Sequence, residues 1–168
     1  MVQDTDLWVV LALAILTVIL LRTSTMRLHE TRQIERPVKE VFAFTADFAN
    51  TEEWDPGVES ARQIGSGPVG AGTTYEVVTK FGSSRIPMEY RIEEYEPNSR
   101  VVLEGRGETV SAVDTIEFEP RDGGTFVDYT ADLTFANWIR HIDPLLKPLM
   151  SRLVGRRALD GLVATLEK

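Results

Sequence analysis

Residues 73–105, TTYEVVTKFGSSRIPMEYRIEEYEPNSRVVLEG, contain three runs in which every second side chain is apolar or aromatic. The residues between them are mostly polar or charged, which is typical of strands with one buried and one wet face. Gly82-Ser83-Ser84 and Glu96-Pro97-Asn98 separate the runs, and residues of these types favour tight reversals of the chain. The segment therefore predicts an antiparallel meander.

The same pattern continues on both sides of this segment. Turn-forming stretches at residues 65–68 and 121–124 delimit further alternating runs. Seven strands are predicted in all, at Leu28–Glu35, Val58–Ile64, Thr73–Phe81, Arg85–Tyr95, Arg100–Gly105, Val110–Glu119 and Thr125–Phe135. Because short turns join most of them, we expect one antiparallel sheet with a single wet face.

One helical region lies between the first and second predicted strands. Arg36-Pro37 predicts a helix start with Pro37 at the first helical position, where its missing N–H costs nothing. A short helical turn should follow through Trp54 and stop at Asp55-Pro56-Gly57. Trp54 either fills a core or forms a hinge near the mouth of a pocket.

A second helix is predicted at the C-terminus. Asp143-Pro144 is a good start signal, and the helical pattern runs to about Leu166. Its apolar stripe changes side at Gly155. One stripe contains Leu145, Leu146, Leu149, Met150 and Leu153, and the other contains Ala158, Leu159, Leu162 and Leu166. We expect either a kink at Gly155 or two halves that bury against different surfaces, the second half holding the sheet.

The N-terminal residues 1–27 form a separate segment. Leu7–Leu21, LWVVLALAILTVILL, carries no charge, Gly or Pro, and its apolar side chains surround the helix axis. Fifteen helical residues span about 22 Å, somewhat short of the ~30 Å hydrocarbon core, although the flanking residues can extend them. The segment predicts a membrane anchor. A cleaved signal peptide is the alternative, but it would need a basic start and a small-residue cleavage site.

Charges around this anchor predict its orientation. Asp4 and Asp6 precede the apolar run, whereas Arg22 and Arg27 follow it. Since basic flanks tend to remain inside, we expect a single-pass membrane protein with its N-terminus outside. The domain of residues 28–168 would then lie in the cytoplasm.

Composition excludes several classes of function. The chain has no Cys and only two His, and His29 and His141 both fall at the margins of predicted elements, where we expect surface residues. A transition-metal site is therefore disfavoured, and no cofactor is indicated. The net charge of −8 argues against nucleic-acid binding through phosphate neutralisation.

Several local motifs resemble one known superfamily. They are Ile34-Glu35-Arg36-Pro37-Val38-Lys39-Glu40-Val41-Phe42, then Asp47 and Trp54-Asp55-Pro56, and finally Gly70-Ala71-Gly72-Thr73 with Tyr75. With the order of elements, they resemble the START-like polyketide cyclase/dehydrase and lipid-transport superfamily (SRPBCC). The resemblance covers about Leu28–Leu166. It implies an α+β helix-grip fold, in which a curved antiparallel sheet wraps the long C-terminal helix and leaves a cavity between them. That fold hosts binders, transporters and enzymes, so it does not by itself decide function.

The inward faces of the strands supply the candidate ligand-binding residues. Aromatic and Met side chains with hydroxyl groups suit an amphipathic ligand such as an isoprenoid, a sterol or an acyl chain. The predicted set is Tyr75, Phe81, Met88, Tyr90, Phe118, Tyr129 and Phe135. The simpler alternative is that these residues fill an ordinary core.

Asp114 is the one weak catalytic candidate. It has the same parity as Ile116 and Phe118, which would direct its carboxyl into an apolar cavity. A buried carboxyl has a raised pKa and can act as a general acid or base, with Tyr90 or Tyr129 orienting a carbonyl beside it. The alternative is a solvated strand end or a salt bridge at the edge of the pocket.

Three functions remain open. The sequence favours a membrane-anchored carrier or sensor that holds a hydrophobic small molecule or lipid between the sheet and the C-terminal helix. The second is a cyclase, dehydratase or hydrolase that uses Asp114 and a tyrosine in the same cavity. The third is a non-catalytic accessory subunit whose anchor packs against a larger membrane protein complex.

Overall fold

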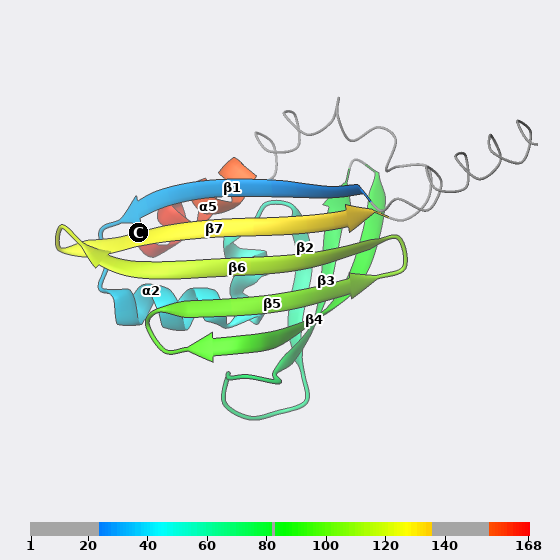
Figure 1. Cartoon of the computed structure of the whole chain (residues 1–168), viewed down its shortest axis with the longest axis horizontal. Coiled ribbons are helices and arrows are strands. Elements are labelled where there is room, and N and C mark those ends of the chain that lie inside the picture. The colour runs from blue at the N-terminus through cyan, green and yellow to red at the C-terminus, as the bar shows by residue number, and fades with distance from the viewer. Residues whose placement is uncertain (1–23, 82, 136–154) are drawn as a thin grey trace, which may run out of the picture.

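The computed structural model describes residues 24–81, 83–135 and 155–168, and Figure 1 shows how they are arranged. The elements in chain order are β1 Ser24–Ile34, α2 Val38–Ala46, η1 Phe48–Asn50, α3 Thr51–Trp54, β2 Val58–Ile64, β3 Thr74–Phe81, β4 Ser84–Glu96, β5 Arg100–Gly107, β6 Val110–Arg121, β7 Gly124–Phe135 and α5 Arg156–Leu166. No helix within these ranges has the length and apolar character to cross a bilayer. The anchor predicted at Leu7–Leu21 lies outside the described residues.

The strands form one antiparallel sheet in the order β1-β7-β6-β5-β4-β3-β2. Strands β2 to β7 are joined as a meander, and β1 pairs with β7 at the far edge. The seven predicted strands are confirmed, with ends that differ by a few residues. β1 begins at Ser24 instead of Leu28, because β7 continues to Phe135 and supplies backbone partners for the extra residues.

Turn chemistry explains why the meander reverses where it does. Asp122 and Gly123, between β6 and β7, have φ angles of 51° and 80°. Two successive positive φ angles match the twist of a tight hairpin, and Asp followed by Gly adopts them at low cost. Asn98, between β4 and β5, has a φ angle of 62°, which Asn tolerates better than most residues. The turns predicted from the sequence at these two places are confirmed.

Alternation along the strands is also confirmed. In β6, Val110, Ala112, Asp114, Ile116 and Phe118 are buried, while the residues between them are exposed or half-buried. The opposite face of the sheet carries the charged side chains, several of which pair across strands, such as Arg27 with Asp132 at 2.7 Å. Exposed pairs of this kind contribute little stability, so the inner face holds the fold together.

One irregularity changes the pattern in β4. The register between β4 and β5 shifts between Ile92 and Glu94, as a β-bulge does. The extra residue inverts the alternation, so that Tyr95 turns inward after Ile92. The Tyr95 ring then meets the Phe42 ring edge-on, with centroids 5.1 Å apart.

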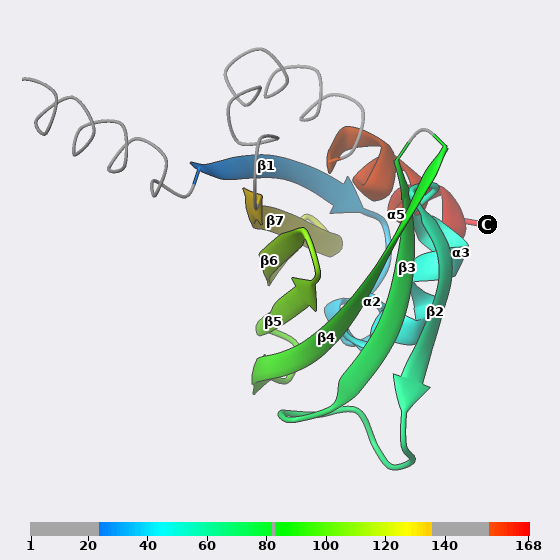
Figure 2. The same ribbon diagram turned by 90° about the vertical axis from the view of Figure 1, so that its right-hand side faces the viewer.

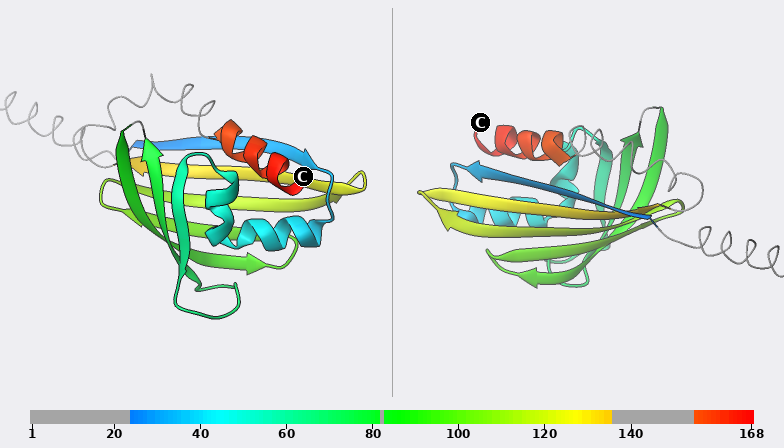
Figure 3. Two further views of the ribbon diagram at one scale, coloured as in Figure 1. Left: turned by 180° about the vertical axis from the view of Figure 1, so that it is seen from behind. Right: turned by 45° about the horizontal axis from the view of Figure 1, so that its top comes forward.

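Helices α2, α3 and α5 all lie on the inner side of the curved sheet, as the turned views show (Figures 2 and 3). Phe42 of α2 packs against Phe118, with centroids 5.2 Å apart and an edge-to-face geometry. Phe48 of η1 packs against Tyr75 and Tyr90 at 6.2 and 5.0 Å. This face of the sheet and these helices share one core, which also contains Trp54. Trp54 therefore fills a core, which is the first of the two alternatives.

The start of α2 differs slightly from the prediction. Val38 is the first helical residue, and Pro37 is the N-cap, with a ψ angle of 141° that lies outside the helical range. The carbonyl of Pro37 accepts hydrogen bonds from the backbone N–H groups of Glu40 and Val41. Pro37 thus still begins the helix, because its fixed φ angle and missing N–H suit the cap as well as the first turn.

Helix α5 holds the sheet with the residues that the sequence indicated. Ala158, Leu159 and Leu162 are buried, and the helix packs against β1 and α3. Gly161 permits α5 to lie close to the end of α3, because a Cβ atom at position 161 would overlap the carbonyl oxygen of Trp54. The helix ends at Leu166, as predicted. The first apolar stripe, Leu145–Leu153, and the predicted start at Asp143-Pro144 lie outside the described residues.

Candidate functional site

The predicted ligand-binding residues divide into two groups on the inner face of the sheet. Tyr75, Met88, Tyr90 and Phe118 are buried in the core beneath α2 and η1. Tyr129 and Phe135 are only half-buried and lie near β1, where Met26, Leu28 and Ala131 form a second apolar cluster. The side chain of Phe81 lies outside what the structure describes.

This division separates core packing from a candidate binding surface. The three aromatic residues of the first group pack against Phe42 or Phe48 and therefore fill space. Half-buried apolar side chains at the second cluster, among them Leu133, remain partly accessible on the inner face. The apolar surface best suited to contact a ligand is thus along β7 and β1. No pattern in the sequence distinguishes these groups, since both have inward parity.

Asp114 lies between the two groups and is only 2% exposed. Its direct neighbours across the sheet are the apolar Leu103 on β5 and Ala131 on β7. The alternative of a solvated strand end or an edge salt bridge is therefore wrong, because the strand continues past Asp114 with unbroken inward alternation. The expectation of an inward-facing carboxyl is confirmed.

Two tyrosines surround the Asp114 carboxyl. Tyr129 donates its hydroxyl hydrogen to Asp114 Oδ1 at 2.7 Å. The Tyr90 hydroxyl lies 3.8 Å from Met88 Sδ and also lies within reach of the Asp114 carboxyl. Burial raises the pKa of Asp114 from 3.8 to about 6, while the hydrogen bond from Tyr129 and the nearby Tyr90 hydroxyl act in the opposite direction. Burial also raises the pKa of each tyrosine well above its usual value.

Gly105 makes this arrangement possible. It lies directly across from Tyr90 in the pairing of β4 with β5, and it is next to Ala112 of β6. A Cβ atom at Gly105 would lie 2.5 Å from Cε1 of the Tyr90 ring. The ring therefore lies directly against the glycine, and its hydroxyl extends diagonally over β5 toward Asp114.

Asp55 is a second carboxyl on the inner side that was not singled out as a site residue. It caps the C-terminus of α3, and its Oδ1 accepts a hydrogen bond from the Gly57 backbone N–H at 2.7 Å. Burial raises the pKa of Asp55, and the charge of Asp55 in turn raises the pKa of Asp114. The Trp54-Asp55-Pro56 motif marked this position, but only its turn chemistry was evident from the sequence.

Three buried polar atoms have no hydrogen-bond partner among the described residues. They are Thr45 Oγ1, Trp54 Nε1 and the Tyr75 hydroxyl. Unpaired buried polar groups cost free energy and are rare in folded proteins. Together with Asp114, they make the interior more polar than its aromatic composition suggests.

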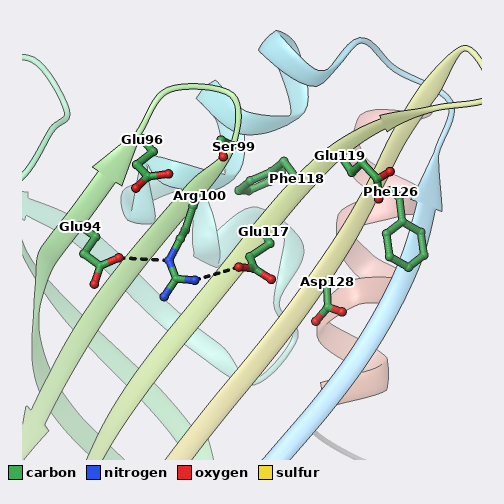
Figure 4. A pocket seen from close by; sticks show the side chains of 9 residues that line it. All are labelled: Glu94, Glu96, Ser99, Arg100, Glu117, Phe118, Glu119, Phe126 and Asp128. Atoms are coloured by element: carbon green, nitrogen blue, oxygen red, sulfur yellow. Dashed lines mark hydrogen bonds and ion pairs between the residues drawn. The ribbon is translucent and has the colours of Figure 1, made fainter.

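The outer face of the sheet carries a shallow hollow of about 580 Å³, shown in Figure 4. Its charged residues are mostly acidic, and Arg100 bridges Glu94 at 3.0 Å and Glu117 at 2.8 Å. It therefore differs in place and character from the predicted apolar site. Exposed, internally paired charges of this kind are ordinary for a wet sheet face, and we assign no function to the hollow.

Within residues 24–81, 83–135 and 155–168, no group of three or more potential ligands could hold a metal ion. His29 is exposed, as expected, and lies 2.8 Å from Asp128 on the outer face. His141 lies outside the described residues.

Comparison with known proteins places the chain among related folds. The sequence model of a family described as polyketide cyclase/dehydrase and lipid transport matches residues 25–167. No curated protein sequence matches the chain. A START superfamily protein of Mycobacterium smegmatis has a similar structure, with a TM-score of 0.72 at 10% identity over 84% of this chain and 97% of that one.

Two further structures show the same fold. A Thermus thermophilus protein has a TM-score of 0.70 at 20% identity, over 84% of this chain and 97% of that one. The Zhui aromatase/cyclase of a Streptomyces species has a TM-score of 0.66 at 13% identity, over 85% of this chain and 94% of that one. At these identities the likeness shows the helix-grip architecture and leaves the ligand open.

Proposed function

Because the chain belongs to the polyketide cyclase/dehydrase and lipid-transport family, we propose that it binds a hydrophobic small molecule or lipid on the inner face of the sheet. The observation that carries this proposal is the half-buried apolar surface along β7 and β1, at Tyr129, Leu133 and Phe135. Apolar side chains that the helices leave partly accessible on a concave face are typical of a ligand site. The C-terminal helix would form the other side of that site.

A membrane anchor at Leu7–Leu21 is part of the same proposal. A tether would keep the domain close to lipid-soluble ligands and raise their effective concentration. In this arrangement the chain crosses the membrane once, with the domain in the cytoplasm. A Ser66→Cys variant places a thiol in the exposed turn after β2. In intact cells it should resist an impermeant thiol reagent and react after lysis, and ready labelling in intact cells would overturn the orientation.

The binding proposal is tested on the full chain extracted in mild detergent. Native mass spectrometry, with analysis of the small molecules released, should show an apolar compound bound in stoichiometric amount. Leu133→Lys places a charge on the inner face, whereas Val113→Lys places the same charge on the outer face, where Val113 is 42% exposed. Leu133→Lys should lose the ligand and Val113→Lys should keep it. Equal occupancy in both variants, or none in the unaltered protein, would contradict the proposal.

Catalysis at Asp114 is the second candidate. It is favoured by a carboxyl whose pKa of about 6 suits proton transfer near neutral pH, with the Tyr129 hydroxyl 2.7 Å away. Incubation with aromatic polyketide or β-hydroxy ketone substrates would show turnover if this candidate is correct. Turnover should then disappear in Asp114→Asn while the variant remains folded. A folded Asp114→Asn variant that keeps full turnover would remove Asp114 from the chemistry.

A further inference from the structure

Asp114 differs from the carboxylates of the outer face in lacking a cationic partner. Asp132 pairs with Arg27, and Glu117 pairs with Arg100. In the part of the chain that the structure describes, no ion pair includes Asp114. An unpaired buried carboxylate is costly, so a negative charge at this place needs a reason.

Among the described residues, an inward-facing basic side chain on the neighbouring β1 is already engaged. Arg32 of β1 contacts Asp160 of α5 at 2.7 Å and Glu30 at 3.6 Å. In the sheet register, Arg32 lies beside Val127, whereas Asp114 lies in the row of Ala131 and Leu28. Arg32 therefore joins helix α5 to the sheet and does not neutralise Asp114.

Within the described residues, the groups that act on the Asp114 carboxyl from the inner side are phenolic or acidic. Tyr90 approaches from β4 and Tyr129 from β7, and the charge of Asp55 after α3 adds negative potential. On β1, Glu30 also faces inward, with Arg32 at 3.6 Å. A site of this composition attracts a cation and repels an anion.

The Tyr129 ring adds a second reason to expect a cation. The Tyr90 ring is buried between Gly105 and Phe48, with the Phe48 centroid 5.0 Å away, so its contribution near Asp114 is the hydroxyl. Tyr129 is half-buried, so its ring is partly accessible beside the carboxyl with which its hydroxyl bonds. Tyrosine faces attract ammonium groups, and a carboxylate next to such rings is a common means of binding amines.

We propose that Asp114 is the counter-ion for the protonated nitrogen of an amphipathic amine, whose apolar body lies on the half-buried surface at Leu133 and Phe135. This inference rests on the proposed binding function and specifies the ligand class. A fatty acid would bring a second carboxylate toward Asp114 and Asp55, and repulsion disfavours it. A neutral alcohol would gain a hydrogen bond without the charge attraction.

Three probes that share one apolar body and differ in the polar group provide the test. Naphthylethylamine, naphthylethanol and naphthylacetate are titrated into the detergent-solubilised full chain, with titrations into detergent alone as the blank. Naphthalene fluorescence reports binding. At pH 7.5 to 8, the amine should bind at least about tenfold tighter than the alcohol, because a close charge pair in a partly buried site couples at least this strongly. The acid should bind weakest.

Variants assign the preference to the carboxyl. Asp114→Asn should lower the affinity for the amine to within about threefold of the affinity for the alcohol, while the affinity for the alcohol stays nearly unchanged. Val113→Asn, on the neighbouring outward position, should keep the original order of the three probes. Tyr129→Phe removes the hydroxyl and keeps the ring. It should weaken binding of the amine far less than Asp114→Asn does.

A pH titration of the unaltered protein gives an independent readout if Asp114→Asn fails to fold. The preference for the amine should fade as the pH drops through about 6, because Asp114 then takes up a proton while the amine stays charged. An alcohol that binds as tightly as the amine at pH 8, or an amine preference that survives Asp114→Asn, overturns the inference and leaves apolar binding intact. Failure of all three probes to bind would count against the binding function itself.

Discussion

Gly161→Ala is the most informative single substitution for the packing of α5, because two effects of opposite sign compete. Alanine is about 1 kcal/mol better than glycine inside a helix, so propensity alone predicts a more stable protein. However, a Cβ atom at Gly161 would overlap the Trp54 carbonyl oxygen at the end of α3. The oxygen is a backbone atom, and the position of a Cβ atom is fixed by its own backbone, so neither can turn aside as the end of a flexible side chain would.

The expected outcome of Gly161→Ala is a net loss of stability. Overpacking costs about 1–3 kcal/mol, and rigid backbone contacts favour the upper end of this range. After the gain in propensity, roughly 1–2 kcal/mol of destabilisation remains, equivalent to a fall of about 3–8 °C in the midpoint of thermal unfolding. Circular dichroism of the full chain during heating measures this midpoint.

Ala164→Gly in the same helix is the matched control. Ala164 is exposed, so this change should reveal propensity alone, with a loss of about 1 kcal/mol. Gly161→Ala makes the opposite exchange, from glycine to alanine, and should nevertheless also lower stability. A Gly161→Ala variant that unfolds at a higher temperature than the unaltered protein would refute the close approach of α5 to α3.

Three further changes test the inner face. Leu162→Ala should cost about 2–5 kcal/mol in chemical denaturation, because Leu162 is fully buried between α5 and the sheet; a loss below about 1 kcal/mol would contradict that placement. Gly105→Ala should displace the Tyr90 ring, lowering the unfolding midpoint and altering the near-ultraviolet circular dichroism of the tyrosines, whereas unchanged spectra would argue against the close contact between the ring and Gly105. Asp114→Asn should stabilise the protein at neutral pH by on the order of 2–3 kcal/mol and reduce the pH dependence of its unfolding free energy. Folding raises the pKa of Asp114 from 3.8 to about 6. The contribution of Asp114 to stability is therefore fully present below pH 3.8 and is lost as the pH rises through 6. A profile that is as steep in the variant as in the unaltered protein would rule out Asp114 as the titrating group.

The sheet could be predicted from the sequence because its signals are local. Period-two alternation gave the strands, and turn residues such as Asp122 and Gly123 gave their ends. The β4 bulge could not be predicted in this way, since an inserted residue between Ile92 and Glu94 is visible only when β5 supplies the register. The inward turn of Tyr95 onto Phe42 was missed for the same reason.

The candidate site was only half predictable from the sequence. Parity placed the Asp114 carboxyl on the inner face, but its environment depends on residues from other strands and from the end of α3. The diagonal reach of Tyr90 requires the empty space over Gly105, which follows from register and not from residue type. Half-burial of Tyr129 and Leu133 depends on where the helices end, which single-strand patterns do not encode.

The pairing of β1 with β7 also determines when the chain can fold. Thr25 and Thr134, which meet across these strands, are 109 residues apart in sequence. Contacts of such long range slow folding, and during synthesis at about 5–20 residues per second the first strand waits several seconds or more for β7, its neighbour in the described sheet. Met26, Leu28 and Ile34, which are all buried in the final fold, stay without their β7 partners during that interval. The nascent chain thus exposes an apolar strand edge until synthesis is nearly complete, and this is the stage at which chaperone binding or aggregation would compete with folding.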